Sequence, residues 1–278
     1  MLDVIIAVLF GLVEGITEWL PVSSTGHMIL LEEFISFEQV SEGFFDMFEV
    51  VIQLGAIMAV VILYWKDIFP FKITKKHAIK VEIDKDIFSM WFKILVACVP
   101  AAVVGLLFDD ILEAYLYNGF VVAAMLVLFG VAFILVENWN KGRSAKVNTL
   151  AELTYQTAAI IGVFQLIAAI FPGTSRSGAT IVGALLIGVS RTVAAEFTFF
   201  LAIPVMFGAS LLKVLKFGFA FTGLELAVLF TGMAVAFVVS MVVIKFLMTY
   251  IKRHDFKVFG WYRIVLGAIV LAYFLIVR

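Results

Sequence analysis

The sequence contains few of the residues that build soluble enzymes and metal-binding modules. Among its 278 residues there is a single cysteine, Cys98, with three histidines and five prolines. One cysteine cannot form an intrachain disulfide, and so few cysteines and histidines exclude a site with many such ligands. Charged residues make up only 15%, against about 25% in a typical soluble domain. A chain of this composition is neither a disordered segment nor a basic nucleic-acid binder.

Hydrophobic residues are in large excess: they make up 64% of the chain and give it a mean hydropathy of +1.13. Six apolar runs are long enough to cross a bilayer, which takes about 20 helical residues. The sequence therefore predicts an all-α polytopic membrane protein with six transmembrane helices. The six runs are 44–64, 89–108, 119–136, 192–212, 221–247 and 258–277.

Two further apolar stretches, 2–31 and 150–189, are interrupted by polar and helix-breaking residues. The first is broken at Glu18 and Pro21 and the second at Pro172, which Gly-Thr-Ser-Arg-Ser-Gly follows. The pieces on either side are shorter than the roughly 20 residues that a spanning helix needs. Irregular backbone at membrane depth persists only where protein or water satisfies its polar groups. We therefore expect two re-entrant helical hairpins, each entering and leaving on one face.

Basic residues test this count of spans, because Lys- and Arg-rich loops stay on the cytoplasmic side. With both broken stretches re-entrant, the loops on one face carry 14 Lys and Arg residues. The loops and termini on the other face carry three. The first face is then cytoplasmic, and both termini lie on the outer face.

The two broken stretches can be aligned through Pro21 and Pro172, which places Ser24 opposite Ser175. Three spans follow each stretch, and because three is odd, the second half begins on the opposite face. The halves are then inverted copies, an arrangement in which transporters place sites near the midplane at broken helices. The predicted halves of this single integral membrane domain are 1–137, with hairpin 1–35, and 138–278, with hairpin 150–190.

Glu14 and Glu18 are the first polar residues that need an explanation. They lie four residues apart, so they share one face of a helix. A charged group at membrane depth costs at least about 2.5–3.5 kcal/mol. Two neighbouring carboxylates can hold back a proton or bind a cation between them. The pair is a candidate for catalysis or metal binding, and a hydrated helix face near the membrane surface is the alternative.

The first loop continues with Ser23, Ser24 and Thr25 and ends at His27. Hydroxyls and an imidazole within reach of carboxylates are the components of an activated nucleophile or a general acid–base set. Alternatively, the hydroxyls only satisfy the broken backbone.

The second loop resembles a cradle for an anion. Small residues such as Gly173 expose backbone N–H groups, and a helix begins just after them. Arg176 adds a fixed charge that can bind phosphate through two hydrogen bonds. The alternative is a structural salt bridge from Arg176 to Glu14, Glu18 or Glu196 across the repeat interface.

Two motifs in these loops resemble the signatures of the bacterial undecaprenyl-diphosphate phosphatase family, the BacA type linked to bacitracin resistance. The resemblance extends over the whole chain in length, motif order and span count. The motifs are Glu14-Gly-Ile-Thr-Glu18-Trp-Leu-Pro-Val-Ser-Ser-Thr-Gly-His27 and Pro172-Gly-Thr-Ser-Arg-Ser-Gly-Ala-Thr180.

The resemblance implies hydrolysis of the terminal phosphate of undecaprenyl diphosphate, which recycles the lipid carrier for peptidoglycan synthesis. It also implies a divalent cation, Mg²⁺ or Ca²⁺, a bacterial inner-membrane location and a site open to the outer face. The expected partners are the polyprenyl diphosphate substrate and membrane lipids, with no nucleic acid, and a homodimer is left open.

Carried over by residue, the resemblance makes Glu14 and Glu18 catalytic or metal-linked, Ser24 the candidate nucleophile and His27 an acid or base. The expected contacts to the diphosphate are Ser175, Arg176, Ser177, Thr180, Gly173 and Thr25.

Two chemical routes and one other function class remain open. Either Ser24, deprotonated through Glu18 or His27, attacks the terminal phosphorus, or one of those bases activates water beside a cation on Glu14 and Glu18. The other class is a polyprenyl-phosphate transporter or flippase of the same inverted-repeat fold, which requires no nucleophile.

Overall fold

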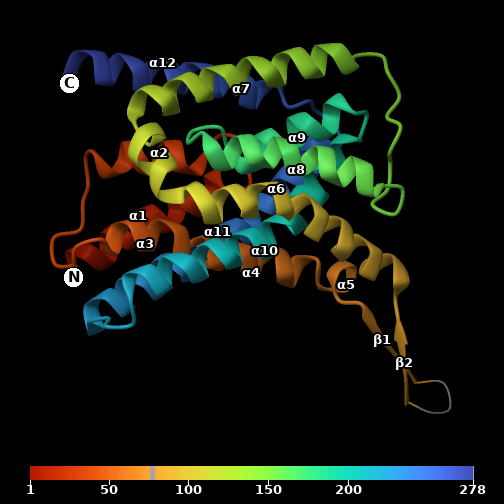
Figure 1. The fold of residues 1–278 in the computed structure, drawn as a ribbon, viewed down its shortest axis with the longest axis horizontal. Coiled ribbons are helices and arrows are strands. Elements are labelled where there is room, and N and C mark those ends of the chain that lie inside the picture. Colours follow the sequence, from red (N-terminus) through yellow and green to blue (C-terminus); the bar gives the residue numbers. More distant parts are fainter. Residues whose placement is uncertain (76–78, 278) are drawn as a thin grey trace.

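The computed structural model describes residues 1–75 and 79–277, and helices dominate it (Figure 1). A single antiparallel pair of strands, β1 (Phe71–Lys75) and β2 (Ile79–Ile83), interrupts the helical order in this described part. The helices are α1 (Leu2–Thr17), α2 (Ser24–Glu32), α3 (Phe44–Val51), α4 (Gln53–Leu63), α5 (Trp65–Ile68), α6 (Lys85–Leu116), α7 (Gly119–Asn140), α8 (Tyr155–Ile170), α9 (Arg176–Leu186), α10 (Arg191–Phe217), α11 (Gly223–Ile251) and α12 (Lys257–Val277).

Six helical segments of the described chain are long and apolar enough to cross a membrane, which confirms the six predicted runs. The first combines α3 and α4, because the intervening Ile52 keeps helical dihedral angles. The segments are Phe44–Leu63, Lys85–Phe108, Gly119–Asn140, Arg191–Phe217, Gly223–Ile251 and Lys257–Ile276.

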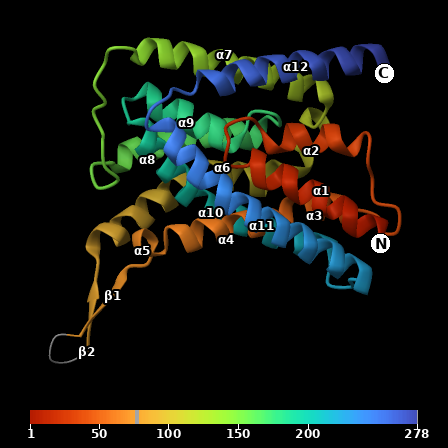
Figure 2. The same cartoon turned by 180° about the vertical axis from the view of Figure 1, so that it is seen from behind.

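The strand pair is a departure from the predicted all-α chain, although the membrane body is helical. It projects from the end of the molecule opposite both termini (Figures 1 and 2). The second strand, Ile-Lys-Val-Glu-Ile, alternates apolar and charged residues, and the first, Phe-Lys-Ile-Thr-Lys, alternates apolar and polar residues over its first four positions. A period of two is the mark of a strand, so the signal was present within the predicted loop.

The two broken stretches form helical hairpins that point toward each other. α1 runs inward from the end that holds the termini, and α2 returns to that end (Figures 1 and 2). α8 runs inward from the end that holds the strands, and α9 returns there. Their placement in a bilayer as re-entrant hairpins stays a prediction.

The first helix of each hairpin packs in the opposite half, with α1 on α11 and α8 on α6. Glycines permit this approach. A Cβ added at Gly11 would lie 2.6 Å from the carbonyl oxygen of Gly232, and one at Gly162 would lie 2.5 Å from that of Ala97. Small residues at helix crossings let backbones pack closely in membranes. The exchange interlocks the two halves of the chain.

α7 and α12 pack against each other and run in opposite directions (Figure 1). A Cβ at Gly130 would lie 2.7 Å from the Gly260 carbonyl oxygen, and one at Gly267 would lie 2.9 Å from that of Ala123. Gly130 and Gly267 are separated by the same number of residues as Ala123 and Gly260. If each residue of one half is replaced by its equivalent in the other half, the contact of Gly130 with Gly260 becomes the contact of Gly267 with Ala123. This relation supports the pairing of α7 with α12 as repeat equivalents, and the boundary at residue 137 stays a prediction.

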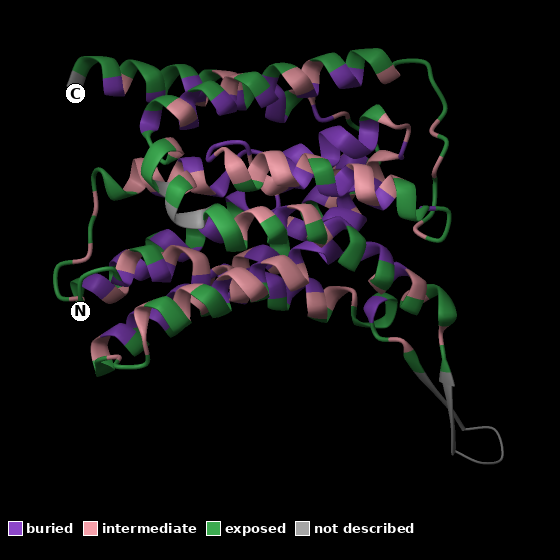
Figure 3. Cartoon of the chain, in the orientation of Figure 1, coloured by how far each residue is buried: buried purple, intermediate pink, exposed green. Residues whose placement is uncertain are grey.

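The buried residues concentrate where the hairpins meet α10 (Figure 3). Phe197, Phe199 and Phe200 of α10 are fully buried there. By contrast, Leu106 and Leu107 of α6 are about two-thirds exposed. Large exposed apolar surfaces are unfavourable in water but suit contact with lipid. The polar groups of the hairpin tips therefore lie in the most enclosed part of the protein.

Candidate active site

The tips of the two hairpins, residues 18–23 and 171–175, meet in the middle of the molecule. Ser177 Oγ, at the start of α9, donates a hydrogen bond to the backbone carbonyl of Glu18 at 3.1 Å. Arg176 Nη2 lies 3.0 Å from Glu18 Oε1. Residues more than 150 positions apart in the sequence are thus in direct contact, as the facing hairpins require.

The carboxylate of Glu18 is the centre of the site. It is 5% exposed, and both of its oxygens have partners. Arg176 donates to Oε1, and Ser24 Oγ donates to Oε2 at 2.6 Å. A hydroxyl bonded to a buried carboxylate is the arrangement of a nucleophile with its general base. The structure therefore brings together Glu18, Ser24 and Arg176 as the sequence predicted.

Arg176 is fixed on its other side by α10. Its Nη1 donates to the backbone carbonyl of Thr198 at 2.9 Å. The hydroxyls of Thr198 and Thr180 lie 2.9 Å apart, and Thr180 also donates to the Arg176 carbonyl. Nε of Arg176 is buried and has no hydrogen-bond partner in the described part of the chain, so one donor of the guanidinium remains for a ligand. Thr198 had no sequence signal, because its contact with Arg176 is made by the backbone.

Each tip ends at a serine with a left-handed backbone. Ser23 has φ +76° and Ser175 has φ +69°. A non-glycine residue in this region is uncommon and strained, which often marks a functional segment. Each serine caps the helix that follows, since Ser23 Oγ accepts from Gly26 N and Ser175 Oγ accepts from Gly178 N.

The shared backbone conformation of Ser23 and Ser175 shifts the alignment of the two hairpins by one residue from the one made through Pro21 and Pro172. Ser23, not Ser24, is the counterpart of Ser175, because the helix start is set by the capping serine and not by the proline. Ser24 then corresponds to Arg176, and each is the first residue of its helix, α2 or α9. The positive ends of both helix dipoles begin beside Glu18, which favours an anionic ligand.

Glu14 lies one helical turn before Glu18 and is 1% exposed. Its Oε1 is buried and has no hydrogen-bond partner among the described residues. Its carboxyl interacts electrostatically with Glu18, Glu49 and Arg176. An orphaned buried oxygen beside other charges is a natural ligand for a cation or a water.

The residues fit a divalent cation only in part. Within the described residues there is no group of three or more His, Cys, Asp or Glu side chains that could hold a metal ion. Mg²⁺, however, is usually bound by one or two carboxylates together with phosphate oxygens and water. Glu14 and Glu18 match that donor set once a diphosphate is present.

His27 is held away from the serine. Its Nδ1 lies 2.7 Å from the Ser23 carbonyl oxygen and its Nε2 lies 2.7 Å from Tyr262 Oη, with the two rings stacked. Since a carbonyl only accepts, Nδ1 carries the proton, and Nε2 of the neutral ring accepts from the Tyr262 hydroxyl. Both ring nitrogens are therefore engaged, and neither bonds Ser24 or Glu18. The acid–base role of His27 stays a prediction.

Several predicted contacts of the diphosphate are used by the fold itself. Gly173 has φ +85°, and a Cβ there would lie 2.6 Å from the Val122 carbonyl oxygen, so only glycine fits. The hydroxyls of Ser175 and Ser177 lie 3.1 Å apart. Thr25 follows Ser24 in α2 and is half-buried. Their part in binding substrate stays a prediction.

Arg263 of α12 is a site residue that the sequence analysis missed. It is fully buried, and its Nη2 donates to the carbonyls of Thr174 at 2.7 Å and Gly173 at 2.9 Å. Its Nη1 donates to the carbonyl of Pro21 at 3.3 Å. An arginine in the middle of an apolar run was the available signal, since charge at membrane depth needs a function.

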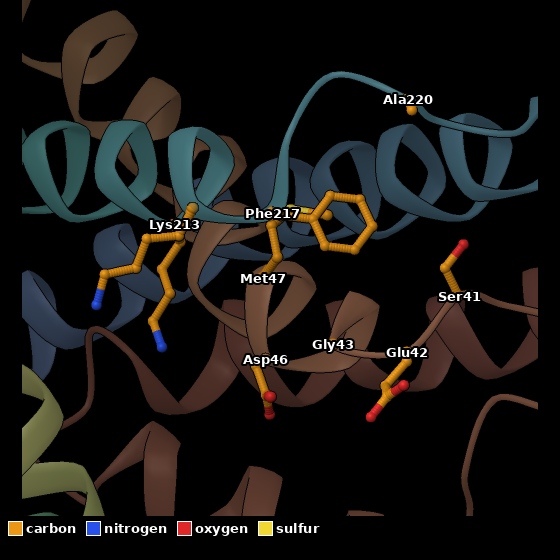
Figure 4. Close-up of a pocket in the computed structure, with 9 residues that line it drawn as sticks. Ser41, Glu42, Gly43, Asp46, Met47, Lys213, Phe217 and Ala220 are labelled. Carbon is orange, nitrogen blue, oxygen red and sulfur yellow. The ribbon is translucent and has the colours of Figure 1, made fainter.

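A cavity of about 540 Å³ lies elsewhere, where the segment before α3 faces the last turns of α10 (Figure 4). None of its lining residues belongs to the hairpin tips, so the cavity is separate from the site described above. They are Ser41, Glu42, Gly43, Asp46, Met47, Lys213, Lys216, Phe217 and Ala220.

Comparison with known proteins gives matches over nearly the whole chain. The family model of bacitracin resistance protein BacA matches residues 7–269. The chain is 64% identical to undecaprenyl-diphosphatase of Desulfitobacterium hafniense, over 99% of this chain and 97% of that protein. It is 60% identical to undecaprenyl-diphosphatase 1 of Clostridium acetobutylicum, over 99% of each. It is 62% identical to undecaprenyl-diphosphatase of Enterococcus faecalis, over 97% of this chain and 96% of that protein.

Proposed function

The chain belongs to the bacitracin resistance protein BacA family, and from this premise we propose that it is an undecaprenyl-diphosphatase. It removes the terminal phosphate of undecaprenyl diphosphate and returns the monophosphate carrier to cell-wall synthesis. The observation that carries the proposal is the buried Glu18 carboxylate with Ser24 on one oxygen and Arg176 on the other. A flippase would need the arginine but not the activated hydroxyl, so the transporter alternative is not favoured.

The headgroup binds between the hairpin tips while the polyprenyl tail stays among the lipid. The diphosphate is attracted by Arg176 and by the starts of α2 and α9. It exchanges for Glu18 as a partner of Arg176, because a phosphate oxygen accepts the same donors as a carboxylate. Arg176 thus pairs with Glu18 in the resting site and with a phosphate oxygen when the substrate is bound. Binding also frees Glu18 to act as a base.

Ser24 is the nucleophile in the route that the geometry favours. As Ser24 Oγ forms a bond to the terminal phosphorus, its proton passes to Glu18 Oε2, and the bridging P–O bond breaks. The departing bridging oxygen takes this proton from Glu18, undecaprenyl monophosphate leaves, and a phosphoserine remains. Glu18, ionised again, then takes a proton from water as the water attacks the phosphoserine, and it returns that proton to Ser24 Oγ as the Ser24 O–P bond breaks and inorganic phosphate is released. Arg176 offsets the charge on the transferred phosphoryl group.

Glu14 and Glu18 would hold a divalent cation together with the substrate's phosphate oxygens. The cation would neutralise charge on the diphosphate.

The site faces the outer side of the bacterial inner membrane. Both termini lie at one end of the molecule, and the strands and the loop 141–154 lie at the other (Figures 1 and 2). The Lys- and Arg-rich loops belong to the latter end, which the positive-inside rule places in the cytoplasm. The α1–α2 hairpin, which carries Glu18 and Ser24, opens toward the former end.

Phosphate release from undecaprenyl diphosphate by the purified protein in detergent tests the proposal. The wild type should release one phosphate per lipid, and EDTA should abolish the release. Glu18→Gln should lower kcat about 10³-fold, within the range expected for loss of a general base. Glu152→Gln, an exposed glutamate at the other end of the molecule, is the matched control and should leave kcat unchanged. Lipid transfer across vesicles without phosphate release would reject the proposal.

A further inference from the structure

We infer that Arg263 is a positioning residue for this reaction, which holds the two hairpin tips in register so that Ser24 and Glu18 face Arg176. The inference rests on the proposed function, and it adds a residue from α12 that lies outside both sequence motifs.

The contacts of Arg263 join the two halves of the site. Its Nη1 donates to the Pro21 carbonyl of the first tip. Its Nη2 donates to the Gly173 and Thr174 carbonyls of the second tip. Nη2 also lies 3.4 Å from the Met125 carbonyl oxygen of α7. One side chain therefore fixes both tips to the α7–α12 pair.

The hydrogen-bond partners of Arg263 are all backbone carbonyls, which neither an anionic substrate nor a proton binds in its place. Arg176, by contrast, must exchange Glu18 for phosphate during turnover, which breaks its contact between the tips. Among the described residues, the hydrogen bonds that still join the tips are those of Ser177 and Arg263, and of these two only Arg263 reaches the turn before each helix. The tips need a contact that persists during turnover, because a displacement of the reacting groups by about 1 Å can slow a reaction about 10²-fold.

Lysine cannot replace Arg263 in this role. The planar guanidinium presents donors in fixed, diverging directions, whereas an ammonium is a single point charge. Arg263→Lys keeps the charge but cannot reach Pro21 and Thr174 at the same time. The space around the guanidinium is also tight, since a Cβ added at Gly178 would lie 3.1 Å from Arg263 Nη1.

The test compares Arg263→Lys with Arg191→Lys in the phosphate-release assay. Arg191 pairs with both oxygens of Glu137 near the strand-bearing end, so it serves a structural purpose remote from the tips. Arg263→Lys should lower kcat about 10²-fold with KM changed less than threefold, because the tips still bind the headgroup but misalign the reacting groups. Arg191→Lys should lower the melting temperature and leave kcat and KM within threefold of wild type.

Two outcomes overturn the inference. The first is a folded Arg263→Lys protein with kcat within threefold of wild type. The second is a loss confined to KM, which would make Arg263 a binding residue only. If Arg263→Lys does not fold, Gly178→Ala decides, because a Cβ there would lie 3.1 Å from Arg263 Nη1 and 3.2 Å from Ser175 Cβ, which crowds the guanidinium against the second tip without removing it. A kcat near wild type in Gly178→Ala then rejects the inference. A wild-type protein that releases no phosphate would instead reject the proposed function.

Discussion

Ser24 and Arg176 occupy the same position in the two hairpins, and each holds one oxygen of the same carboxylate, that of Glu18. Each is the first residue of a helix that a left-handed serine caps. The inverted halves thus supply equivalent backbones but different side chains, a hydroxyl from one and a guanidinium from the other. A near-symmetric scaffold becomes an asymmetric site, as phosphoryl transfer requires, because attack and charge stabilisation need different groups.

Replacing Ser24 by alanine removes the proposed nucleophile while leaving the fold intact. We expect kcat to fall by about 10³-fold or more, because water must then attack without a hydroxyl bonded to Glu18. Ser210→Ala is the control, since Ser210 is also buried but bonds the Val50 carbonyl away from the tips.

Labelled substrate gives a direct check of this route. Rapid quenching of the wild type should trap phosphate on Ser24, detected by mass spectrometry of the peptide. Near-normal turnover by Ser24→Ala would show that water is the nucleophile and that Ser24 only orients Glu18.

Replacing Arg176 by lysine tests whether the planar fork matters. Arg176 reaches Glu18 and the Thr198 carbonyl at the same time, and an ammonium cannot replace both contacts. We expect kcat/KM to fall about 10²-fold, measured as initial rates of phosphate release. Arg253→Lys, which changes an exposed position in the loop between α11 and α12, should behave as wild type. Equal activity in the two variants would contradict the assignment of Arg176.

Much of this arrangement is visible in the sequence, and the reason is energetic. Apolar runs define the spans, and polar residues inside apolar stretches are so unfavourable that they mark the site. That reasoning predicts Glu18, Ser24 and Arg176 as site residues, and the three side chains are in contact in the structure. It also left open whether Arg176 pairs with a carboxylate, and the structure shows the pair with Glu18.

The parts that were missed depend on backbone geometry, which residue types do not reveal. Arg263 was counted as part of a span, and its partners are carbonyls that any residue can supply. The partner of Nε2 of His27 is Tyr262, a residue of α12 far away in the sequence. The offset between the repeats was wrong because prolines do not set where a helix begins, whereas the capping serines do.

Glu14→Gln separates metal binding from stability. Because no described residue hydrogen-bonds Glu14 Oε1, an amide in place of the carboxylate breaks no hydrogen bond at that atom, and the melting temperature should change little. A cation that uses Glu14 should bind less tightly, so the Mg²⁺ concentration for half-maximal rate should rise about tenfold. A Mg²⁺ titration after EDTA treatment measures this. An unchanged titration curve would remove Glu14 from the cation's ligands.

Gly11→Val tests the exchanged packing that brings the tips together. A valine side chain at this position collides with the Gly232 carbonyl and with Val235 of α11. Overpacking of this kind typically costs about 1–3 kcal/mol, so the thermal unfolding midpoint in detergent should fall clearly. Gly208→Val is the matched control, because it adds the same side chain to a helix at a position where an added Cβ would meet no atom of another described element within 4 Å. If both variants lose the same stability, valine itself disfavours these helices, and the α1–α11 crossing does not depend on Gly11. If only Gly11→Val is affected, kcat should fall as well, since α1 carries Glu18 at its end and a shifted α1 moves the carboxylate away from Arg176.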